Sequence, residues 1–321
     1  MDQSSFLETT QKPSMPILVT GSAGYLGLTV VEKLVQQNQE IIAAYRSKIP
    51  DPMHNLCAMT VDLLNKELLK APLRGVSTVI HLAWDRGRGE TSPDASKASR
   101  NDFKALESSV NLECLRNLIE AMEHAKTPKI IFISAVGADR EAKDSFLREK
   151  YLCEQLIINS AIREKIIIRC SPLYGGPKEA GFIQAVKKLM KSQFFYPIPK
   201  IDAPISPLHV DDLAELIAKC SLVKMYDFCA IVDLVGGEPY SVSRIFKMIA
   251  QQTNKNLFPL GTFIGNLYVN MMERKNLKHE PKVSEYFAMG SRIEKKIRHK
   301  NPLAKLLPEK CRTFEEGFAS H

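Results

Sequence analysis

The sequence predicts an α/β fold, in which a doubly wound parallel sheet is followed by a smaller C-terminal lobe. Two observations predict it. Short apolar runs alternate with longer amphipathic stretches over residues 15–171, beyond which proline and glycine are frequent and the alternation ends. The first apolar run, residues 17–20, breaks into Gly21, Gly24 and Gly27 and then becomes helical. Strand, tight turn and helix in this order are typical of the first unit of such a sheet.

The glycine-rich turn points to a phosphate site. Gly21 can take the positive φ that the turn needs, Gly24 leaves no Cβ between the backbone N–H groups and a pyrophosphate, and Gly27 lets the helix pack close to the strand. These N–H groups lie at a helix N-terminus, where partial positive charge favours phosphate. Glycine turns also occur for purely structural reasons, so the motif alone is a weak signal. The predicted dinucleotide-binding residues of the turn are Gly21, Ser22, Ala23, Gly24, Tyr25, Leu26 and Gly27.

The remaining elements follow from hydrophobic periodicity. A second strand at 40–45 lies about 20 residues after the turn, which is the spacing of a βαβ unit. Unbroken apolar strands suit a parallel sheet that is buried on both faces. We expect strands at 58–63, 78–83, 129–134, 165–169 and 230–237, helices at 25–37, 104–125 and 146–160, a further helix after 205–214, and a loop over 84–100.

Composition indicates a globular protein and excludes several classes. The 321 residues are 45% hydrophobic, which is enough for a large core. The net charge of +8 is scattered among acidic residues, so we expect no nucleic-acid binding. The 7 cysteines form no C-x-x-C pair and no zinc-type cluster, which predicts no metal site and fits a reducing compartment. Neither a signal peptide nor an apolar run of about 18 residues is found, so we expect a cytoplasmic protein without a membrane span.

A set of motifs in a fixed order makes the sequence resemble the extended short-chain dehydrogenase/reductases, the NAD-dependent epimerase/dehydratase group. The resemblance covers residues 15 to about 250. It rests on Thr-Gly-x-x-Gly-x-x-Gly at 20–27, Asp62-Leu63, His81-Leu82-Ala83, Asn111, Lys150, Arg169 with Tyr174-Gly175, and the segment 207–214.

The resemblance implies a Rossmann-type sheet that carries the dinucleotide and a substrate cleft between this sheet and the C-terminal lobe. It implies a dinucleotide-binding domain over 15–175, to which 203–237 return, and a mainly substrate-side lobe over 176–321. Residues 1–14 are expected to be a flexible tail. Relatives often form homodimers through two long helices, so a homodimer is a further expectation.

Cofactor roles are carried over position by position. Asp62, followed by Leu63, resembles the carboxylate that accepts a hydrogen bond from the adenine amino group, although a helix N-cap would also explain it. Arg46 stands where many NAD-preferring relatives have an acid. A guanidinium suits a 2′-phosphate, so the sequence favours NADP(H) over NAD(H), with a solvated loop charge as the alternative. The backbone of His81, Leu82 and Ala83 is expected beside the cofactor, with space filling as the alternative role of the His81 ring. Asn111 and His209 are interpreted as structural.

The catalytic motif departs from the family. Relatives carry a Tyr-x-x-x-Lys pair on one helix face, in which the phenol exchanges a proton and the ammonium binds the nicotinamide ribose. Here Phe146 stands in the tyrosine position before Lys150. Ala135 and Val136 occupy the places where the family's serine or threonine falls, which leaves only Ser134 nearby. Lys150 is expected to keep its contact with the ribose.

Three interpretations remain open. The first is an atypical oxidoreductase or epimerase acting on an anionic or nucleotide-sugar-like substrate, with Lys150 and Tyr174 as catalytic candidates, although loop packing is the favoured role of Tyr174. The second is a non-catalytic NADP(H)-binding redox sensor, regulatory or structural subunit. The third, a scaffold with a vestigial site, is weakened by the intact glycine turn. The residues considered for the cleft lining are Trp84, Asp85, Arg86, Arg88, Lys178, Gln184, Tyr196 and Lys200.

Overall fold

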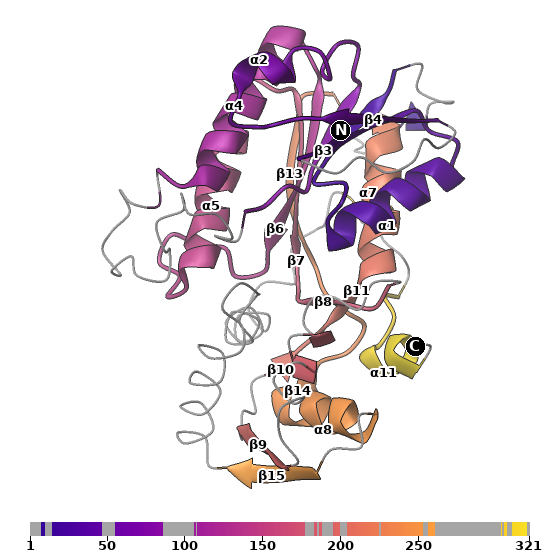
Figure 1. Cartoon of the computed structure of the whole chain (residues 1–321), viewed down its shortest axis with the longest axis vertical. Helices are drawn as coiled ribbons and strands as arrows, with labels where there is room; N and C mark the ends of the chain where they lie inside the picture. The colour runs from indigo at the N-terminus through magenta and orange to yellow at the C-terminus, as the bar shows by residue number, and fades with distance from the viewer. Residues whose placement is uncertain are drawn as a thin grey trace, which may run out of the picture.

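The structure is a computed structural model, and Figure 1 shows a larger layered domain above a smaller lobe. It describes residues 8–9, 15–46, 55–85, 106, 108–176, 183–184, 186–187, 195–199, 204–224, 226–252, 256–260, 303, 305–306 and 310–319.

A seven-stranded parallel sheet forms the centre of the larger domain, in the order β13-β7-β6-β5-β2-β3-β4. Within this sheet the chain starts at β2, runs outward through β3 and β4, and then crosses to β5 on the other side of β2. The topological switch point therefore lies between β2 and β5, where ligands of such sheets bind. The strands are β2 (Ile17–Thr20), β3 (Ile41–Tyr45), β4 (Leu56–Thr60), β5 (Thr78–His81), β6 (Lys129–Ala135), β7 (Glu164–Cys170) and β13 (Phe228–Leu234).

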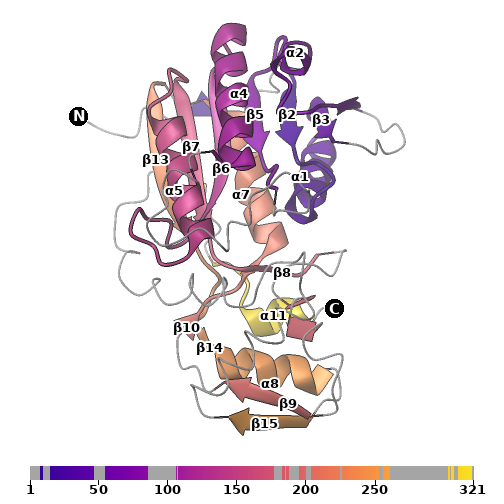
Figure 2. The ribbon, with the colours of Figure 1, turned by 60° about the vertical axis from the view of Figure 1, so that its left-hand side comes forward.

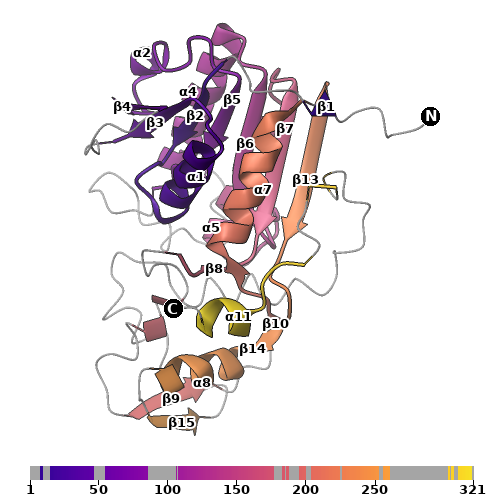
Figure 3. The same cartoon turned by 90° about the vertical axis from the view of Figure 1, so that its right-hand side faces the viewer.

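Helices cover both faces of the sheet, which confirms the predicted doubly wound α/β fold. In Figure 3, α1 (Tyr25–Gln36) and α7 (Val210–Leu222) lie on one face. The other face is covered by α2 (Lys66–Leu69), α4 (Val110–Ala125) and α5 (Ser145–Ile158).

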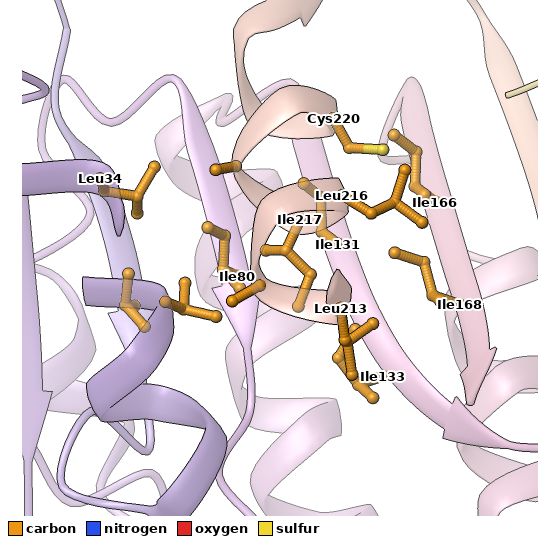
Figure 4. Packing of buried hydrophobic residues seen from close by; sticks show 14 of the residues in the cluster. Leu34, Ile80, Ile131, Ile133, Ile166, Ile168, Leu213, Leu216, Ile217 and Cys220 are labelled. Atoms are coloured by element: carbon orange, nitrogen blue, oxygen red, sulfur yellow. The ribbon is translucent and has the colours of Figure 1, made fainter. Parts of the chain in front are cut away.

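The period-two alternation of the strands divides the core between these two layers. Ile131 and Ile133 of β6 pack with the cluster under α1 and α7, whereas Ile130 and Phe132 pack with the cluster under α4 and α5. Figure 4 shows the first cluster, in which Leu213, Leu216 and Ile217 of α7 face isoleucines of the sheet. The inner strands β2, β5 and β6 are thus buried on both sides, as the unbroken apolar runs predicted, whereas the edge strands β4 and β13 are partly exposed.

The smaller lobe follows the carboxyl edge of the sheet (Figure 2). It has its own aromatic-rich core, in which Tyr174, Tyr240, Phe246 and Phe314 are almost fully buried. Its elements are β8 (Leu173–Tyr174), β9 (Phe195–Pro199), β10 (Pro204–Ile205), β11 (Leu208–His209), β14 (Tyr240–Ser241), α8 (Val242–Gln252), β15 (Asn256–Leu260) and α11 (Phe314–Ala319), with strand pairs β8–β11, β9–β15 and β10–β14.

Several element boundaries differ from the sequence prediction. The third strand, expected at 58–63, begins and ends earlier, at Leu56–Thr60, because Asp62 turns the chain by accepting a hydrogen bond from the Leu64 N–H. The fourth strand ends at His81. Helix α4 begins at Val110 rather than at residue 104, since the Ser109 side chain caps it by accepting from the Leu112 N–H.

Part of the expected N-terminal tail is paired. Residues Glu8–Thr9 form β1, which lies antiparallel to β12 (Val223–Lys224) at the end of α7. The other residues of 1–14 lie outside the described part of the chain.

Candidate dinucleotide-binding site

Two glycines of the turn between β2 and α1 have no room for a side chain. Gly21 has φ +71°, and an added Cβ would lie 2.6 Å from the Ala83 nitrogen. A Cβ on Gly27 would lie 2.1 Å from the Gly21 carbonyl oxygen, so this glycine lets α1 pack onto the turn. Ser22 faces inward and donates from its hydroxyl to the Val19 carbonyl. The side chain of Ser22 is therefore occupied, and its backbone forms the cradle.

Gly24 is the N-cap of α1, with no side chain to cap it. Among the described residues, a Cβ added there would meet only the Gly21 oxygen, at 3.0 Å. A bare helix N-terminus at the switch point of the sheet has the donors and the partial charge that a pyrophosphate requires. The cradle therefore fits a dinucleotide by its shape and by the chemistry of its donors.

Side-chain contacts tie the ends of β2 and β5 together beside this cradle. Thr20 Oγ1 accepts from the N–H groups of Leu82 and Ala83, each at 3.3 Å, and lies 2.8 Å from His81 Nδ1. His81 is buried and stacks on Phe132. Burial, together with the nearby charge of Lys150, lowers the pKa of His81 to about 3, so the ring is neutral at physiological pH. The structure places His81 as a fixed support for the segment that follows β5.

The ends of β3 and β4 carry the two residues predicted to read the adenosine half. The Arg46 side chain is 77% exposed and its guanidinium lies 3.6 Å from the Asp85 carboxylate. Such an exposed pair contributes less than about 1 kcal/mol, so a phosphate could replace the carboxylate as partner. Asp62 Oδ1 accepts from the Leu64 N–H, while Asn65 is the N-cap of α2. Asp62 is therefore a turn residue rather than the helix cap considered as its alternative role.

Lys150 is held among aromatic rings. Its ammonium donates to the Ile133 carbonyl at 2.9 Å and lies 3.5 Å from the centre of the Trp84 ring, 4.9 Å from that of Phe132 and 5.7 Å from that of Phe146. Phe146 packs edge-on against Trp84. The position of the expected phenol is thus part of an apolar enclosure around the ammonium. The sequence predicts Trp84 only as part of the cleft lining; its position shortly after the strand that pairs with β6 was the available signal for a place beside Lys150.

The hydroxyl of Ser134 is bonded to a buried carboxylate rather than free to assist a reaction. It donates to Glu154, whose fully buried carboxylate also accepts two bonds from Arg169, at 2.8 and 2.6 Å. Ser134 follows Phe132 on the same face of β6, so the strand periodicity directs it toward α5. Arg169, one of the motif residues, completes a buried ion pair.

Tyr174, the second catalytic candidate, lies in the core of the smaller lobe. It is fully buried, and its hydroxyl donates to the Thr313 carbonyl at 2.8 Å. Burial raises the pKa of the phenol well above its usual value. These contacts favour the packing interpretation over proton transfer. His209 packs edge-on against Tyr174, and its Nδ1 lies 3.0 Å from Arg312, consistent with an architectural role.

Asn111 braces the segment after β5. Its amide accepts from the Asp85 N–H at 2.7 Å and donates to the Asp85 carbonyl at 2.9 Å and to Glu149 at 3.1 Å. Asn111 thus joins this segment to Glu149 of α5, in keeping with the structural role expected of it. Burial raises the pKa of Glu149, whereas the hydrogen bonds from Ser109 and Asn111 lower it.

Much of the predicted cleft lining is not described. Arg86, Arg88, Lys178 and Lys200 lie outside the described residues, as does the Tyr196 side chain. Among the residues that the structure does describe, no group of three His, Cys, Asp or Glu could hold a metal ion. Within the same residues, no helix has the length and apolar character needed to span a membrane.

A groove of about 400 Å³ lies between α4 and α5, on the surface turned away from the sheet. Its floor is apolar, from Leu112, Ile119, Leu152 and Leu156, and its rim carries Arg116, Glu120 and Glu123.

Comparison with known proteins identifies a family and a shared fold. The sequence model of the NAD dependent epimerase/dehydratase family matches residues 17–221. An uncharacterized protein of Mycobacterium tuberculosis is 22% identical over 267 residues, which are 83% of this chain and 26% of that protein. This chain thus spans about a quarter of the length of that relative. The mitochondrial NADH dehydrogenase [ubiquinone] 1 alpha subcomplex subunit 9 of Rattus norvegicus is 23% identical over 75% of this chain and 62% of its own.

Solved structures share the fold. A nucleoside-diphosphate-sugar epimerase from Staphylococcus aureus superposes with TM-score 0.69 at 16% identity, covering 96% of this chain and 100% of that one. The NADPH-dependent quinone oxidoreductase QOR2 of Escherichia coli, solved with NADPH, gives TM-score 0.66 at 16% identity, covering 95% and 99%.

Proposed function

The chain belongs to the NAD-dependent epimerase/dehydratase family, a family that binds NAD(P), and on that premise we propose that it is an NADP(H)-binding protein with a sensing or regulatory role. The observation that carries the proposal is an intact glycine cradle combined with an apolar enclosure around Lys150. The cradle retains the means to hold the dinucleotide, whereas Phe146 has no proton to exchange.

The proposed site follows the carboxyl edge of five neighbouring strands, from β4 to β6. Asp62 and Arg46, after β4 and β3, would bind the adenosine half, Gly24 and the N-terminus of α1 the pyrophosphate, and Lys150, above β6, the nicotinamide ribose. Strands lie about 4.8 Å apart, so β3 and β6 are separated by roughly 14 Å, a span that suits an extended dinucleotide. The bound nicotinamide would supply a hydride donor or acceptor; the chain would bind and orient it.

The chemistry of the site supports binding more than turnover. A missing general acid costs about 10² to 10⁴ in rate. Of the hydroxyl groups weighed as replacements, that of Ser134 is bonded to Glu154 and that of Tyr174 to Thr313. The name of the rat relative, a subunit of NADH dehydrogenase, agrees with a member of this fold acting inside an assembly.

An enzyme is the second candidate, and the retained Lys150 favours it. An atypical oxidoreductase or epimerase could take its proton from water or from an anionic or nucleotide-sugar-like substrate. Appearance of product with such substrates and either dinucleotide, in amounts exceeding the protein, would select this candidate over a sensor.

The test of the binding proposal is a titration with NADPH and NADH in parallel, following dihydronicotinamide emission and energy transfer from Trp84, the single tryptophan. We expect micromolar binding with NADPH preferred. Gly24→Val should weaken both by more than tenfold, because its branched side chain occupies the approach of the pyrophosphate. Absence of binding by the folded wild-type protein would refute the proposal.

The proposed preference for NADPH rests on Arg46. Arg46→Asp should reverse the preference, since a carboxylate repels a 2′-phosphate and accepts bonds from a ribose diol. Arg74→Asp, the same charge change at the opposite edge of the sheet, is the matched control. An unchanged ratio of the two affinities in Arg46→Asp would contradict the 2′-phosphate role.

We further propose a cytoplasmic location, because all 7 cysteines are free thiols. We also propose a homodimer that buries the α4–α5 groove. Leu152→Asp places a charge on the apolar floor and should shift sedimentation toward the monomer. A monomeric wild-type protein at micromolar concentration would rule this dimer out.

A further inference from the structure

The indole of Trp84 covers the residue that is proposed to bind the nicotinamide ribose. With its ring centre 3.5 Å from Lys150 Nζ, the indole is in van der Waals contact with the ammonium. Lys150 is only 8% exposed, and its ammonium also donates to the Ile133 carbonyl below it. The ammonium is thus held between a carbonyl on the strand and an aromatic face above.

A ribose cannot share the face of the ammonium that the indole occupies. A hydroxyl oxygen must come within about 2.7–3.2 Å of a nitrogen to accept its hydrogen bond. A ring centred 3.5 Å away fills that space. Indole and ribose are therefore alternative partners of the same group.

The backbone on both sides of Trp84 is fixed, so the ring can leave only by rotating its side chain. The preceding N–H, of Ala83, is bonded to Thr20, and the following residue, Asp85, is bonded through both its N–H and its carbonyl to Asn111. Trp84 itself is partly exposed, so solvent borders the ring. A rotamer change on a fixed backbone is a small movement.

We propose that Trp84 is a cover that makes the nicotinamide half of the site conditional on rotation of one side chain. The inference rests on the proposed dinucleotide function. The adenosine half and the pyrophosphate bind at the open cradle, and the nicotinamide ribose then competes with the indole for Lys150. Trp84 is in this sense a selectivity residue, which lowers affinity for a complete dinucleotide and leaves affinity for an adenosine phosphate unaffected.

The test compares two ligands by isothermal titration calorimetry. NADP⁺ has both halves, whereas adenosine 2′,5′-bisphosphate lacks the nicotinamide ribose. A cation–π contact with a desolvated ammonium corresponds to about a tenfold change in an equilibrium constant. Trp84→Ala should therefore bind NADP⁺ roughly tenfold more tightly, Trp84→Phe should be intermediate, and affinity for the bisphosphate should stay within about twofold.

A second variant isolates the competition for Lys150. In Lys150→Met the indole no longer competes for a cation, so adding Trp84→Ala should give no further gain in NADP⁺ affinity. In the wild-type protein, NADP⁺ should shift Trp84 emission to longer wavelength as the ring moves into water, and the bisphosphate should not.

Each outcome decides between the two proposals. If the bisphosphate binds and Trp84→Ala leaves NADP⁺ affinity unchanged or weaker, the cover is refuted while the dinucleotide site stands. If neither ligand binds the wild-type protein, the proposed function fails and the cover fails with it. Should Trp84→Ala not fold, two measurements decide: the NADP⁺ affinity of Trp84→Phe and the emission shift of Trp84 in the wild-type protein.

Discussion

The buried imidazole of His81 should make the protein acid-sensitive in a defined pH range. Folding places this ring against Phe132 and near the Lys150 charge, and the resulting desolvation lowers its pKa from 6.5 to about 3. In the unfolded chain the His81 imidazole therefore binds a proton as the pH falls through 6.5, whereas in the folded chain it stays neutral at that pH. Because the pKa of His81 is lower in the folded state, the contribution of its neutral ring to the free energy of unfolding is complete above pH 6.5. This contribution is lost progressively as the pH falls toward 3.

The expected loss can be worked from these values. Between about pH 7.5 and about pH 5.5, protonation of the unfolded imidazole lowers the free energy of unfolding by roughly 1.4 kcal/mol. At both pH values the folded ring stays neutral, so the figure depends only on the ordinary pKa of histidine. His81→Asn removes the titration and can keep a hydrogen bond to Thr20, so it should lose about 1.4 kcal/mol less than the wild-type protein over this range.

Urea unfolding at both pH values, followed by circular dichroism, measures the difference. His124→Asn, which removes an exposed imidazole near the end of α4, is the matched control and should follow the wild-type pH dependence. Parallel pH dependences of wild type and His81→Asn, within about 0.5 kcal/mol, would refute the assignment of His81 as a neutral buried support.

Three further substitutions test the site and its surroundings. Glu154→Gln should lower the free energy of unfolding by about 3 kcal/mol, measured in urea, because it leaves the largely buried Arg169 without its carboxylate; a loss under about 1 kcal/mol would contradict this. Tyr174→Phe should cost about 1–2 kcal/mol through the lost bond to Thr313 and leave dinucleotide affinity unchanged, whereas a specific loss of turnover would restore Tyr174 as a catalytic residue. If the general acid is the one missing group, Phe146→Tyr should raise the rate of NADPH-dependent carbonyl reduction by about tenfold or more. The rate is measured by absorbance at about 340 nm, where dihydronicotinamide absorbs. An inert variant would show that the enclosure around Lys150 also blocks the reaction.

The fold could be predicted from the sequence because its signals are local. Apolar runs, the glycine turn and the amphipathic helices each depend on neighbouring residues, and the sheet they predict is present. The errors lie at element ends, where one hydrogen bond decides the boundary. Ser109 caps α4 and Asp62 turns the chain after β4, and neither bond can be foreseen from periodicity.

The site could be predicted only in part, because its side chains are positioned by strands far apart in sequence. The roles of Gly21 and Gly27 follow from the turn itself, and the structure gives each the contact that requires glycine. The pairing of Arg46 with Asp85 and the enclosure of Lys150 by Trp84 depend on which strands lie side by side. The direction of Ser134 was predictable from strand periodicity, since alternate residues face opposite layers.

The late position of α7 and β13 in the sequence has a consequence for biosynthesis, because β13 is the last strand of the sheet and α7 covers one of its faces. A ribosome that has released the chain only as far as β8 has made six of the seven parallel strands, and Ile131, Ile133, Ile166 and Ile168 still lack the helix that covers them in Figure 4. Their cover, α7, emerges about forty residues later, which corresponds to several seconds of synthesis. During that interval the nascent chain presents a broad apolar face, so we expect it to engage a chaperone and an isolated fragment ending near residue 176 to aggregate. The cofactor cradle is encoded early, but it becomes part of a stable molecule only once the second half of the chain has been made.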